Sequence, residues 1–467
     1  MTSQASIHER VRWGAHVAVH DEVLDVDFEL ALVAARALGG VAALDSAGGS
    51  PSRWSLIGFD PLERAEAIAD LSGLRTLVGR APALSVDGPF AGGFIGAVSY
   101  DLGIAGEALD LPDPPRSGPS VTGGLYTDHF WFDHGSGSVR LRLFEVTGSE
   151  GQPDPRGSLG ERVARAEAEL ARAEVPGPVR AQLPERLVSA DEHCARVERL
   201  RGAIAEGEVY QANLAHRMTI AVEGDPLALY LALRRTNAAP YAGYLEHADP
   251  VGGRHALLSS SPELMVELTD GRARTRPIKG TSERHDDPDL DARSRAELLA
   301  SRKDRAELAM IVDLARNDLG RLAVRGGVDV GPFPELESYA AVHHLVADVC
   351  AELRPEVDAV DCLAATFPAA SISGAPKLAA MEWIAALEGE GRSFFTGSLG
   401  FIDTVGRACF NVLIRTLEWR EERGSRPEVW LTVGGGITWD SVAAAEDRET
   451  LHKARAMLRA LGVEEPA

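Results

Sequence analysis

The segment RPIKGTSERHDDPDLDARSRAELLASRKDRAELAMIVDLARNDLG, residues 276–320, contains the two features around which the rest of the chain is organised. It begins as the end of a strand that carries Lys279 into a glycine turn. A polar, acidic loop follows, and a helix is then predicted over 301–318. Asp304 and Glu307 share one face of that helix, because they are three residues apart. A lysine at an apolar strand end and acids on the apolar side of a helix both need a chemical reason.

The composition is that of an acidic globular protein. The chain has 467 residues and a formal net charge of −22. Such a surface repels phosphate backbones, so we expect no nucleic-acid partner. The first 20 residues lack the apolar run of a signal peptide, and no apolar stretch is long enough to span a bilayer. We therefore expect a cytoplasmic protein without membrane contact. The four cysteines lack Cys-x-x-Cys spacing and are predicted to be buried, reduced thiols.

Three portions are predicted along the chain. They are an N-terminal portion of the fold over 1–150, a helix and proline-rich linker over 151–188, and a C-terminal portion over 189–467 that carries the candidate site. The expected helices cover 27–35, 159–174, 189–206, 226–235, 301–318, 338–351, 376–388 and 441–461. The expected strands cover 41–46, 53–58, 92–101, 120–146, 213–220, 255–268, 394–403, 407–419 and 428–437, with a turn at 50–52. Because helix pairs separate groups of antiparallel-looking strands, the predicted fold class is α+β with layered sheets.

Charged residues at apolar positions are the first candidates for chemistry. Burial of Lys279 would lower its pKa and free an amine nucleophile, although the local sequence alone favours a lysine that extends to solvent. Glu446 and Glu449 on the last helix repeat the spacing of Asp304 and Glu307, with Lys453 one turn further on. Two such pairs suit a hard cation such as Mg²⁺. For either pair alone, an exposed acidic face paired with arginines is the stronger interpretation.

Four further features could bind an anion or fill the core. The run FPAASISGAPK (367–377) leads into a helix start, which favours a carboxylate or is a simple serine cap. Arg415 is predicted to be buried in an apolar strand, where it needs an internal acid or a substrate carboxylate. The glycines at 434–436 end a strand and expose backbone N–H groups. His343 and His344 are expected on a helix, with one of them buried and hydrogen-bonded.

Taken together, these motifs resemble the chorismate-utilising enzymes. The resemblance is densest over 189–458 and rests on KDRAE (303–307), SGAPK (373–377) and the triple glycine with its downstream glutamates. It implies a four-layer α/β/β/α fold with orthogonally packed antiparallel sheets, chorismate as the substrate and Mg²⁺ as the cofactor. The implied metal ligands are Glu307 and Glu449, with Asp304 and Glu446 nearby. The implied substrate contacts are Arg415, Gly434, Gly435, Gly436 and Lys453 at the enolpyruvyl carboxylate, Ser371 and Gly374 at the ring, and His344 beside the ring carboxylate.

Within the family, three positions select the reaction. Lys279 stands where anthranilate synthases typically carry alanine, and resembles the nucleophile of the members that aminate chorismate at C4. Glu263 matches the acid that protonates the leaving hydroxyl. Gln211 stands where isochorismate synthases place a water-activating lysine. The resemblance therefore implies formation of 4-amino-4-deoxychorismate, for a folate or specialised aromatic pathway. The alternatives are an anthranilate synthase with an unusual lysine and a non-catalytic regulatory relative.

Other positions bear on partners and on departures from the family pattern. No cysteine lies in a Gly-x-Cys-x-Gly motif, so a separate glutaminase subunit is expected to deliver the ammonia. Ala369-Ala370 replaces a run that usually contains glycine, and Phe395 replaces a common tyrosine that would contact the substrate. The residues around Ser46 and Pro240 differ from those of tryptophan-inhibited members. Tryptophan could still be held there as a structural ligand.

Overall fold

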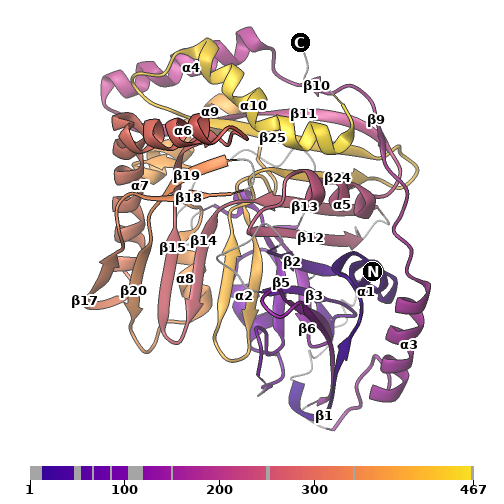
Figure 1. Ribbon diagram of the computed structural model, residues 1–467. Helices are drawn as coiled ribbons and strands as arrows, with labels where there is room; N and C mark the ends of the chain where they lie inside the picture. Colours follow the sequence, from indigo (N-terminus) through magenta and orange to yellow (C-terminus); the bar gives the residue numbers. More distant parts are fainter. Residues whose placement is uncertain are drawn as a thin grey trace, which may run out of the picture.

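The computed structural model describes residues 13–46, 54–65, 68–84, 87–103, 119–148, 151–248, 253–339 and 342–463. Two large antiparallel sheets stack face to face in these residues, and helices cover the outer face of each (Figure 1). A smaller three-stranded sheet lies beside them and carries the beginning of the 276–320 segment.

The larger sheet combines strands from the two ends of the chain. Its order is β1 (Trp13–Leu24), β8 (Ser138–Gly148), β7 (His129–Asp133), β3 (Trp54–Gly58), β2 (Ala42–Asp45), β12 (Tyr241–Ala248), β13 (Arg254–Ser261), β24 (Thr416–Glu421), β25 (Glu428–Ile437), β11 (Gln211–Glu223) and β10 (Glu185–Arg186). Two short strands, β9 (Arg180–Ala181) and β21 (Gly374–Ala375), also pair with β11. Because β2 pairs directly with β12, strands from before and after the linker form one continuous sheet.

The second sheet has nine strands. Its order is β17 (Ala323–Val330), β20 (Val349–Leu353), β15 (Arg272–Arg276), β14 (Leu264–Thr269), β23 (Ala408–Asn411), β22 (Ser398–Asp403), β5 (Gly93–Val98), β6 (Val121–Tyr126) and β4 (Glu63–Arg64). The three-stranded sheet consists of β16 (Ile278–Glu283), β19 (Val342–Val346) and β18 (Glu335–Ser338). The 3₁₀ turn η1 (Tyr100–Leu102) follows β5.

Helices form the two outer layers. Those on the larger sheet are α1 (Phe28–Leu38), α3 (Leu159–Arg172), α4 (Ala190–Glu206), α5 (Pro226–Thr236), α9 (Lys377–Glu388) and α10 (Ala443–Leu461). Those on the nine-stranded sheet are α2 (Leu71–Val78), α7 (Arg302–Gly320) and α8 (Ala359–Thr366), while α6 (Pro288–Ala300) packs on the small sheet. The caps follow the sequence signals: Ser189 accepts from the backbone N–H of Glu192 at the start of α4, and α1 ends at Gly39, whose φ of 101° suits glycine.

Three apolar clusters confirm the predicted four layers. One cluster, with Leu308 and Phe410, fills the space between the nine-stranded sheet and its helices. A second, with Trp419 and Leu458, lies between the larger sheet and its helices. A third, with Ile95 and Leu257, joins the inner faces of the two sheets. Since burial of apolar area is the main driving force of folding, these three layers of contact hold the helices and sheets together.

The predicted helix over 338–351 is wrong. The described part of this segment forms the end of β18, then β19 and the start of β20. Its apolar residues fit a helical period as well as a strand period, and pairing decides between them: β19 lies between β16 and β18, and β20 between β15 and β17. Both His343 and His344 are buried, because neighbouring strand residues face opposite sides and both faces of β19 are covered.

Other predicted elements have different boundaries in the structure. The expected strand over 255–268 is interrupted at Pro262-Glu263, so that β13 and β14 belong to different sheets. The expected strand over 407–419 is likewise divided into β23 and β24. The acidic loop before α7 contains α6, which Asp287 caps and Pro288 begins. The predicted linker contributes the strands β9 and β10 to the larger sheet. The predicted turn at 50–52 lies outside the described residues.

Candidate active site

Lys279 lies on β16 and points toward the acidic helix that follows it in the sequence. Its Nζ is 3.8 Å from Glu307 Oε2 on α7, and 17% of its side chain is exposed, so it is half-buried and does not extend to solvent as the local sequence alone favoured. Burial lowers the pKa of Lys279; the charge of Glu307 opposes this effect, and that of Lys453 adds to it. The amine is therefore closer to its neutral, nucleophilic form than an exposed lysine would be.

Glutamates from α7 and α10 face the same group of lysines. Lys303 Nζ is 3.8 Å from Glu307 Oε1, and Lys453 Nζ is 2.9 Å from Glu449 Oε1. Although burial alone would raise the pKa of Glu449, the lysines at 453, 279 and 303 hold it below its usual value. The two helices, more than 100 residues apart in the sequence, thus bring their acids into one electrostatic cluster.

The glycine run at the end of β25 lies against this cluster. Lys453 Nζ donates to the carbonyl oxygen of Gly434 at 2.9 Å. A Cβ atom at Gly435 would lie 3.5 Å from Glu446 Oε2 and 3.9 Å from Glu449 Oε1. A Cβ atom at Gly436 would lie only 2.9 Å from Lys279 Nζ. A side chain at Gly436 would displace the ends of Lys279 and Gln211, and one at Gly435 would occupy the space beside the acids, so the glycines keep this part of the site open.

The donor chemistry of this cluster fits a hard cation. Glu307, Glu446 and Glu449 offer carboxylate oxygens, which Mg²⁺ prefers. Burial raises the pKa of Glu446, and the neighbouring charge of Glu449 adds to this rise. A dication would therefore relieve the repulsion between these two acids. The Asp304 carboxylate is less available to a cation, because it accepts a hydrogen bond from the Ser301 hydroxyl. The same hydroxyl accepts from the Asp304 backbone N–H.

Glu263 lies where the chain passes from β13 to β14. It is 5% exposed and lines a small cavity of about 20 Å³ together with Ser371. Burial raises the pKa of Glu263 to about 7, although the Ser371 hydroxyl, the Lys279 charge and a hydrogen bond with the Ile278 backbone act in the opposite direction. A carboxyl group with this pKa holds a proton that it can donate near neutral pH.

Arg415 and His344 form a second, electropositive part of the site. Arg415 lies between β23 and β24 with φ of 51°, not within a strand as predicted. Burial lowers its pKa, and among the described residues no carboxylate forms an ion pair with its guanidinium. His344 Nδ1 is 3.0 Å from Thr281 Oγ1, while its Nε2 is buried without a hydrogen-bond partner in the described chain. A half-buried cation without a counter-charge among the described residues favours an anionic ligand.

The remaining predicted residues surround these groups. A Cβ atom at Gly374 would lie 2.2 Å from the carbonyl oxygen of Gln211, so glycine allows β21 to approach β11 closely. Gln211 Nε2 would lie 2.9 Å from a Cβ atom at Gly436, the same distance as Lys279 Nζ. Phe395 is 4% exposed, and the Arg392 guanidinium lies 5.5 Å from its ring centre.

Burial and hydrogen bonding separate the structural residues from the site. His343 is hydrogen-bonded through both ring nitrogens, to Ser338 Oγ at 2.7 Å and Asp291 Oδ1 at 3.0 Å, and so has a structural role. All four cysteines are free thiols, but only Cys362 is fully buried, which corrects the expectation for the other three. Within the described residues, no helix is long and apolar enough to cross a membrane.

Two residues near the site were not among the predicted ones. Lys303 contacts Glu307, and Thr281 is bonded to His344. The four-residue spacing of Lys303 and Glu307 could have indicated the first contact. The second depends on the pairing of β16 with β19, which brings Thr281 opposite His344 and leaves no local signal in the sequence.

A larger cavity lies away from these groups, between the sheets. It has a volume of about 290 Å³, and Ser46 and Pro240 are among its lining residues. Trp54, Leu399 and Phe401 give it apolar and aromatic walls, while other parts of the lining are polar. This is the place at which the sequence suggested a tryptophan ligand.

The fold, with its two stacked antiparallel sheets, and the site, with its acids, lysines and glycines, can be compared with known families. The comparison with known families agrees: the pattern described as "chorismate binding enzyme" matches residues 46–459. The chain belongs to this family.

Individual relatives carry two different activities in their names. Anthranilate synthase component 1 of Streptomyces coelicolor is 37% identical over 431 residues, covering 88% of this chain and 81% of the relative. Aminodeoxychorismate synthase component 1 of Klebsiella aerogenes is 36% identical over 375 residues, covering 80% and 78%. The crystal structure of anthranilate synthase component I from Streptococcus pneumoniae TIGR4 has a TM-score of 0.72 at 27% identity, covering 88% of this chain and 93% of that one. Overall similarity therefore does not choose between the two reactions.

Proposed function

We propose that this protein is the synthase component of an aminodeoxychorismate synthase, which converts chorismate and ammonia to 4-amino-4-deoxychorismate. The observation that carries the proposal is Lys279: a half-buried amine 3.8 Å from Glu307 and beside Gly436. Its lowered pKa gives it the nucleophilicity that this reaction requires. Because the relatives include both anthranilate synthases and aminodeoxychorismate synthases, the choice between these two reactions rests on the chemistry of the site.

The proposed reaction has two substitutions that use Lys279 and Glu263. The neutral amine of Lys279 forms a bond to ring C2, the ring double bonds shift, and the 4-hydroxyl departs as water with a proton from Glu263. The lysine nitrogen then loses its extra proton. Ammonia forms a bond to C4, the double bonds shift back, and the C2–nitrogen bond breaks to release the lysine amine, which regains a proton. No oxidant or reductant is needed.

The remaining residues bind and orient the substrate in this proposal. Arg415 and the Gly434–Gly436 backbone, with Lys453, receive the enolpyruvyl carboxylate, and His344 lies beside the ring carboxylate. Ser371 and Gly374 line the ring. Glu307 and Glu449 would hold Mg²⁺, with Glu446 and Asp304 nearby, and the ion would supply positive charge for the ring carboxylate. This charge is needed because the protein itself carries a net charge of −22.

Two further ligands complete the proposal. A separate glutaminase subunit delivers the ammonia, with free ammonium as a substitute in vitro. Tryptophan is a structural ligand of the cavity beside Ser46 and Pro240, whose aromatic walls and volume of about 290 Å³ suit an indole side chain. Calorimetric titration with tryptophan tests this part; absence of binding heat would remove it without affecting the reaction assigned to Lys279.

The second candidate is anthranilate synthase. It is favoured by the relative from Streptomyces coelicolor, which aligns over 88% of this chain. In that reaction ammonia attacks C2 directly, and Lys279 would have no covalent role. The position of the new amino group therefore separates the two functions.

The test is product identity after incubation with chorismate, ammonium and Mg²⁺. The proposal expects 4-aminobenzoate after addition of an aminodeoxychorismate lyase, and no fluorescent anthranilate. Anthranilate without 4-aminobenzoate would assign the second candidate. A non-catalytic relative would form neither product, and turnover that chelation of Mg²⁺ abolishes excludes it.

Substitution of the lysine tests its role. Lys279→Ala should lower C4 amination at least about a hundredfold, as expected when a group that acts on the reacting atoms is lost. Lys279→Arg keeps the charge beside Glu307 but has no nucleophilic amine, so it should be equally impaired. The matched control is Lys303→Ala, which also removes an ammonium group 3.8 Å from Glu307 and should retain C4 amination. Activity of Lys279→Arg close to that of the parent would refute the covalent role.

A further inference from the structure

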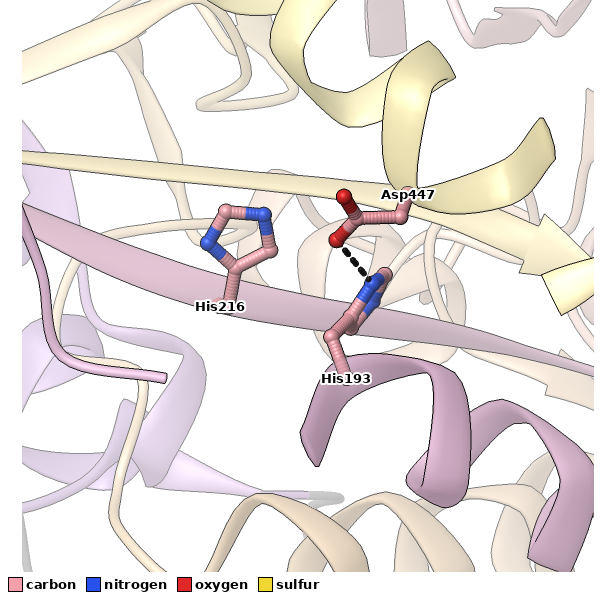
Figure 2. A group of neighbouring side chains, drawn as sticks. All are labelled: His193, His216 and Asp447. Atoms are coloured by element: carbon pink, nitrogen blue, oxygen red, sulfur yellow. Dashed lines mark hydrogen bonds and ion pairs between the residues drawn. The ribbon is translucent and has the colours of Figure 1, made fainter. Parts of the chain in front are cut away.

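His193, His216 and Asp447 converge from three elements at a place that the proposed reaction does not use. His193 lies in the first turn of α4, His216 near the middle of β11 and Asp447 at the start of the second turn of α10. Figure 2 shows the Asp447 carboxylate next to both imidazole rings. One potential ligand atom from each residue lies within 4.8 Å of the others, and in the described residues no other three His, Cys, Asp or Glu side chains meet this condition.

We propose that these three side chains bind a transition-metal ion of the Zn²⁺ type, at a structural site distinct from the acidic cluster at Glu307 and Glu449. This inference does not depend on which reaction the enzyme catalyses. Two imidazole nitrogens and one carboxylate oxygen form a donor set typical of Zn²⁺, whereas Mg²⁺ prefers oxygen ligands alone.

Hydrogen bonds indicate which nitrogen donates in each of the two histidines. Asp447 Oδ1 can only accept, so His193 Nδ1 donates to it at 2.9 Å. Thr450 donates its hydroxyl hydrogen to the Asp447 backbone carbonyl oxygen at 2.7 Å, so it accepts from His216 Nε2 at 2.8 Å. Each ring therefore donates through that nitrogen and, in its neutral form, carries a lone pair on the other nitrogen.

Those lone pairs have no partner. His193 Nε2 and His216 Nδ1 are buried and form no hydrogen bond with the described residues. The residues are 1% and 3% exposed, and burial lowers the pKa of both. A buried polar atom without a hydrogen-bond partner is destabilising, and two of them on rings whose centres lie 5.0 Å apart need an explanation. A half-turn of a ring about its Cβ–Cγ bond exchanges its two edges, so either nitrogen can be presented to an ion.

The geometry requires only local adjustment. Ligands about 2.1 Å from a tetrahedral ion are about 3.4 Å apart, so the three atoms would close by at most about 1.4 Å. Arg186 holds Asp447 from the other side, with Nη2 2.7 Å from Oδ1 and Nη1 3.3 Å from Oδ2. The positive charge of Arg186 repels a dication and so weakens any purely electrostatic binding. An ion with strong affinity for nitrogen ligands is therefore favoured over Mg²⁺.

A bound ion would connect α4, β11 and α10. Asp447 lies between Glu446 and Glu449 in the sequence, so a fixed Asp447 would also fix the turn of α10 that presents those acids. The expected consequence is a stabilised fold, since an ion that binds only the folded chain raises its stability.

The experiment is metal binding by the full chain in excess Mg²⁺, which occupies the acidic cluster. Elemental analysis after equilibration with Zn²⁺ and dialysis should find one Zn²⁺ per chain, and Zn²⁺ should raise the melting temperature. Co²⁺ in place of Zn²⁺ should give visible absorption bands of a nitrogen-coordinated ion. His193→Gln and His216→Gln should each weaken binding at least about tenfold. His255→Gln on β13, a histidine outside the triad, is the matched control and should bind as the parent does.

Four outcomes would overturn the proposal, of which the first three concern the parent protein and the triad variants. They are a parent protein without stoichiometric Zn²⁺, Co²⁺ without visible bands, and equal Zn²⁺ binding by the parent and folded triad variants. If the variants do not fold, the proposal is judged by the Zn²⁺ content and the Co²⁺ spectrum of the parent protein. Loss of Zn²⁺ binding in Glu307→Gln, with binding retained in His193→Gln, would assign the ion to the acidic cluster and likewise overturn it.

Discussion

The raised pKa of Glu263 predicts a specific dependence of stability on pH. In the folded protein Glu263 keeps its proton up to a pKa of about 7, whereas in the unfolded chain it releases it near 4.5. The stabilisation from this difference is fully present below pH 4.5 and is lost as the pH rises through about 7. Between pH 5 and pH 8 the loss amounts to on the order of 2.5 kcal/mol for a carboxyl group with these two pKa values.

Glu263→Gln removes this titrating group, and the glutamine side chain has nearly the same shape as the glutamate side chain. The difference in unfolding free energy between variant and parent should therefore change by on the order of 2.5 kcal/mol from pH 5 to pH 8, in favour of the variant. Urea unfolding of both proteins at pH 5, 6, 7 and 8 measures it. Every other titrating group is common to the two proteins, so the difference isolates Glu263. Unfolding free energies that change in parallel with pH would refute the assignment.

The same pKa should limit catalysis on the alkaline side. If protonated Glu263 is the general acid, the rate of C4 amination falls above about pH 7, and Glu263→Gln lowers it by about 10²–10⁴-fold and removes this limb. An alkaline limb that persists in Glu263→Gln would assign it to another group.

Three further substitutions test the remaining roles. Glu307→Gln should raise the Mg²⁺ concentration for half-maximal activity by on the order of tenfold or more, because a charged ligand is lost; an unchanged requirement contradicts the ligand role. Arg415→Gln should lower kcat/KM for chorismate by on the order of 10–100-fold, the value of a charge-assisted hydrogen bond, with the larger part in KM. Phe395→Tyr should lower KM if the hydroxyl regains a substrate contact, and steady-state kinetics at saturating Mg²⁺ measure both.

The sequence predicted most of the elements because their signals are local. The helix that ends at Gly39, the helix that begins after Ser189 and the strand that ends in three glycines all carry their caps or breakers in the sequence. The segment 338–351 had no such signal. Its apolar residues suit both periods, and pairing decides its conformation, including pairing with strands more than 50 residues earlier in the chain.

The sequence by itself determined the family, because the acids three residues apart, the lysine before a glycine turn and the triple glycine together resemble the motifs of chorismate-utilising enzymes, although each of them alone has a structural interpretation. Tertiary structure decided which of these groups act on one another. It brings Lys279 to 3.8 Å from Glu307, places Glu263 where burial raises its pKa to about 7, and leaves Arg415 without an acid in the described chain. Burial and charge at a given atom depend on neighbours from distant segments, and these are fixed only when the two sheets close on each other.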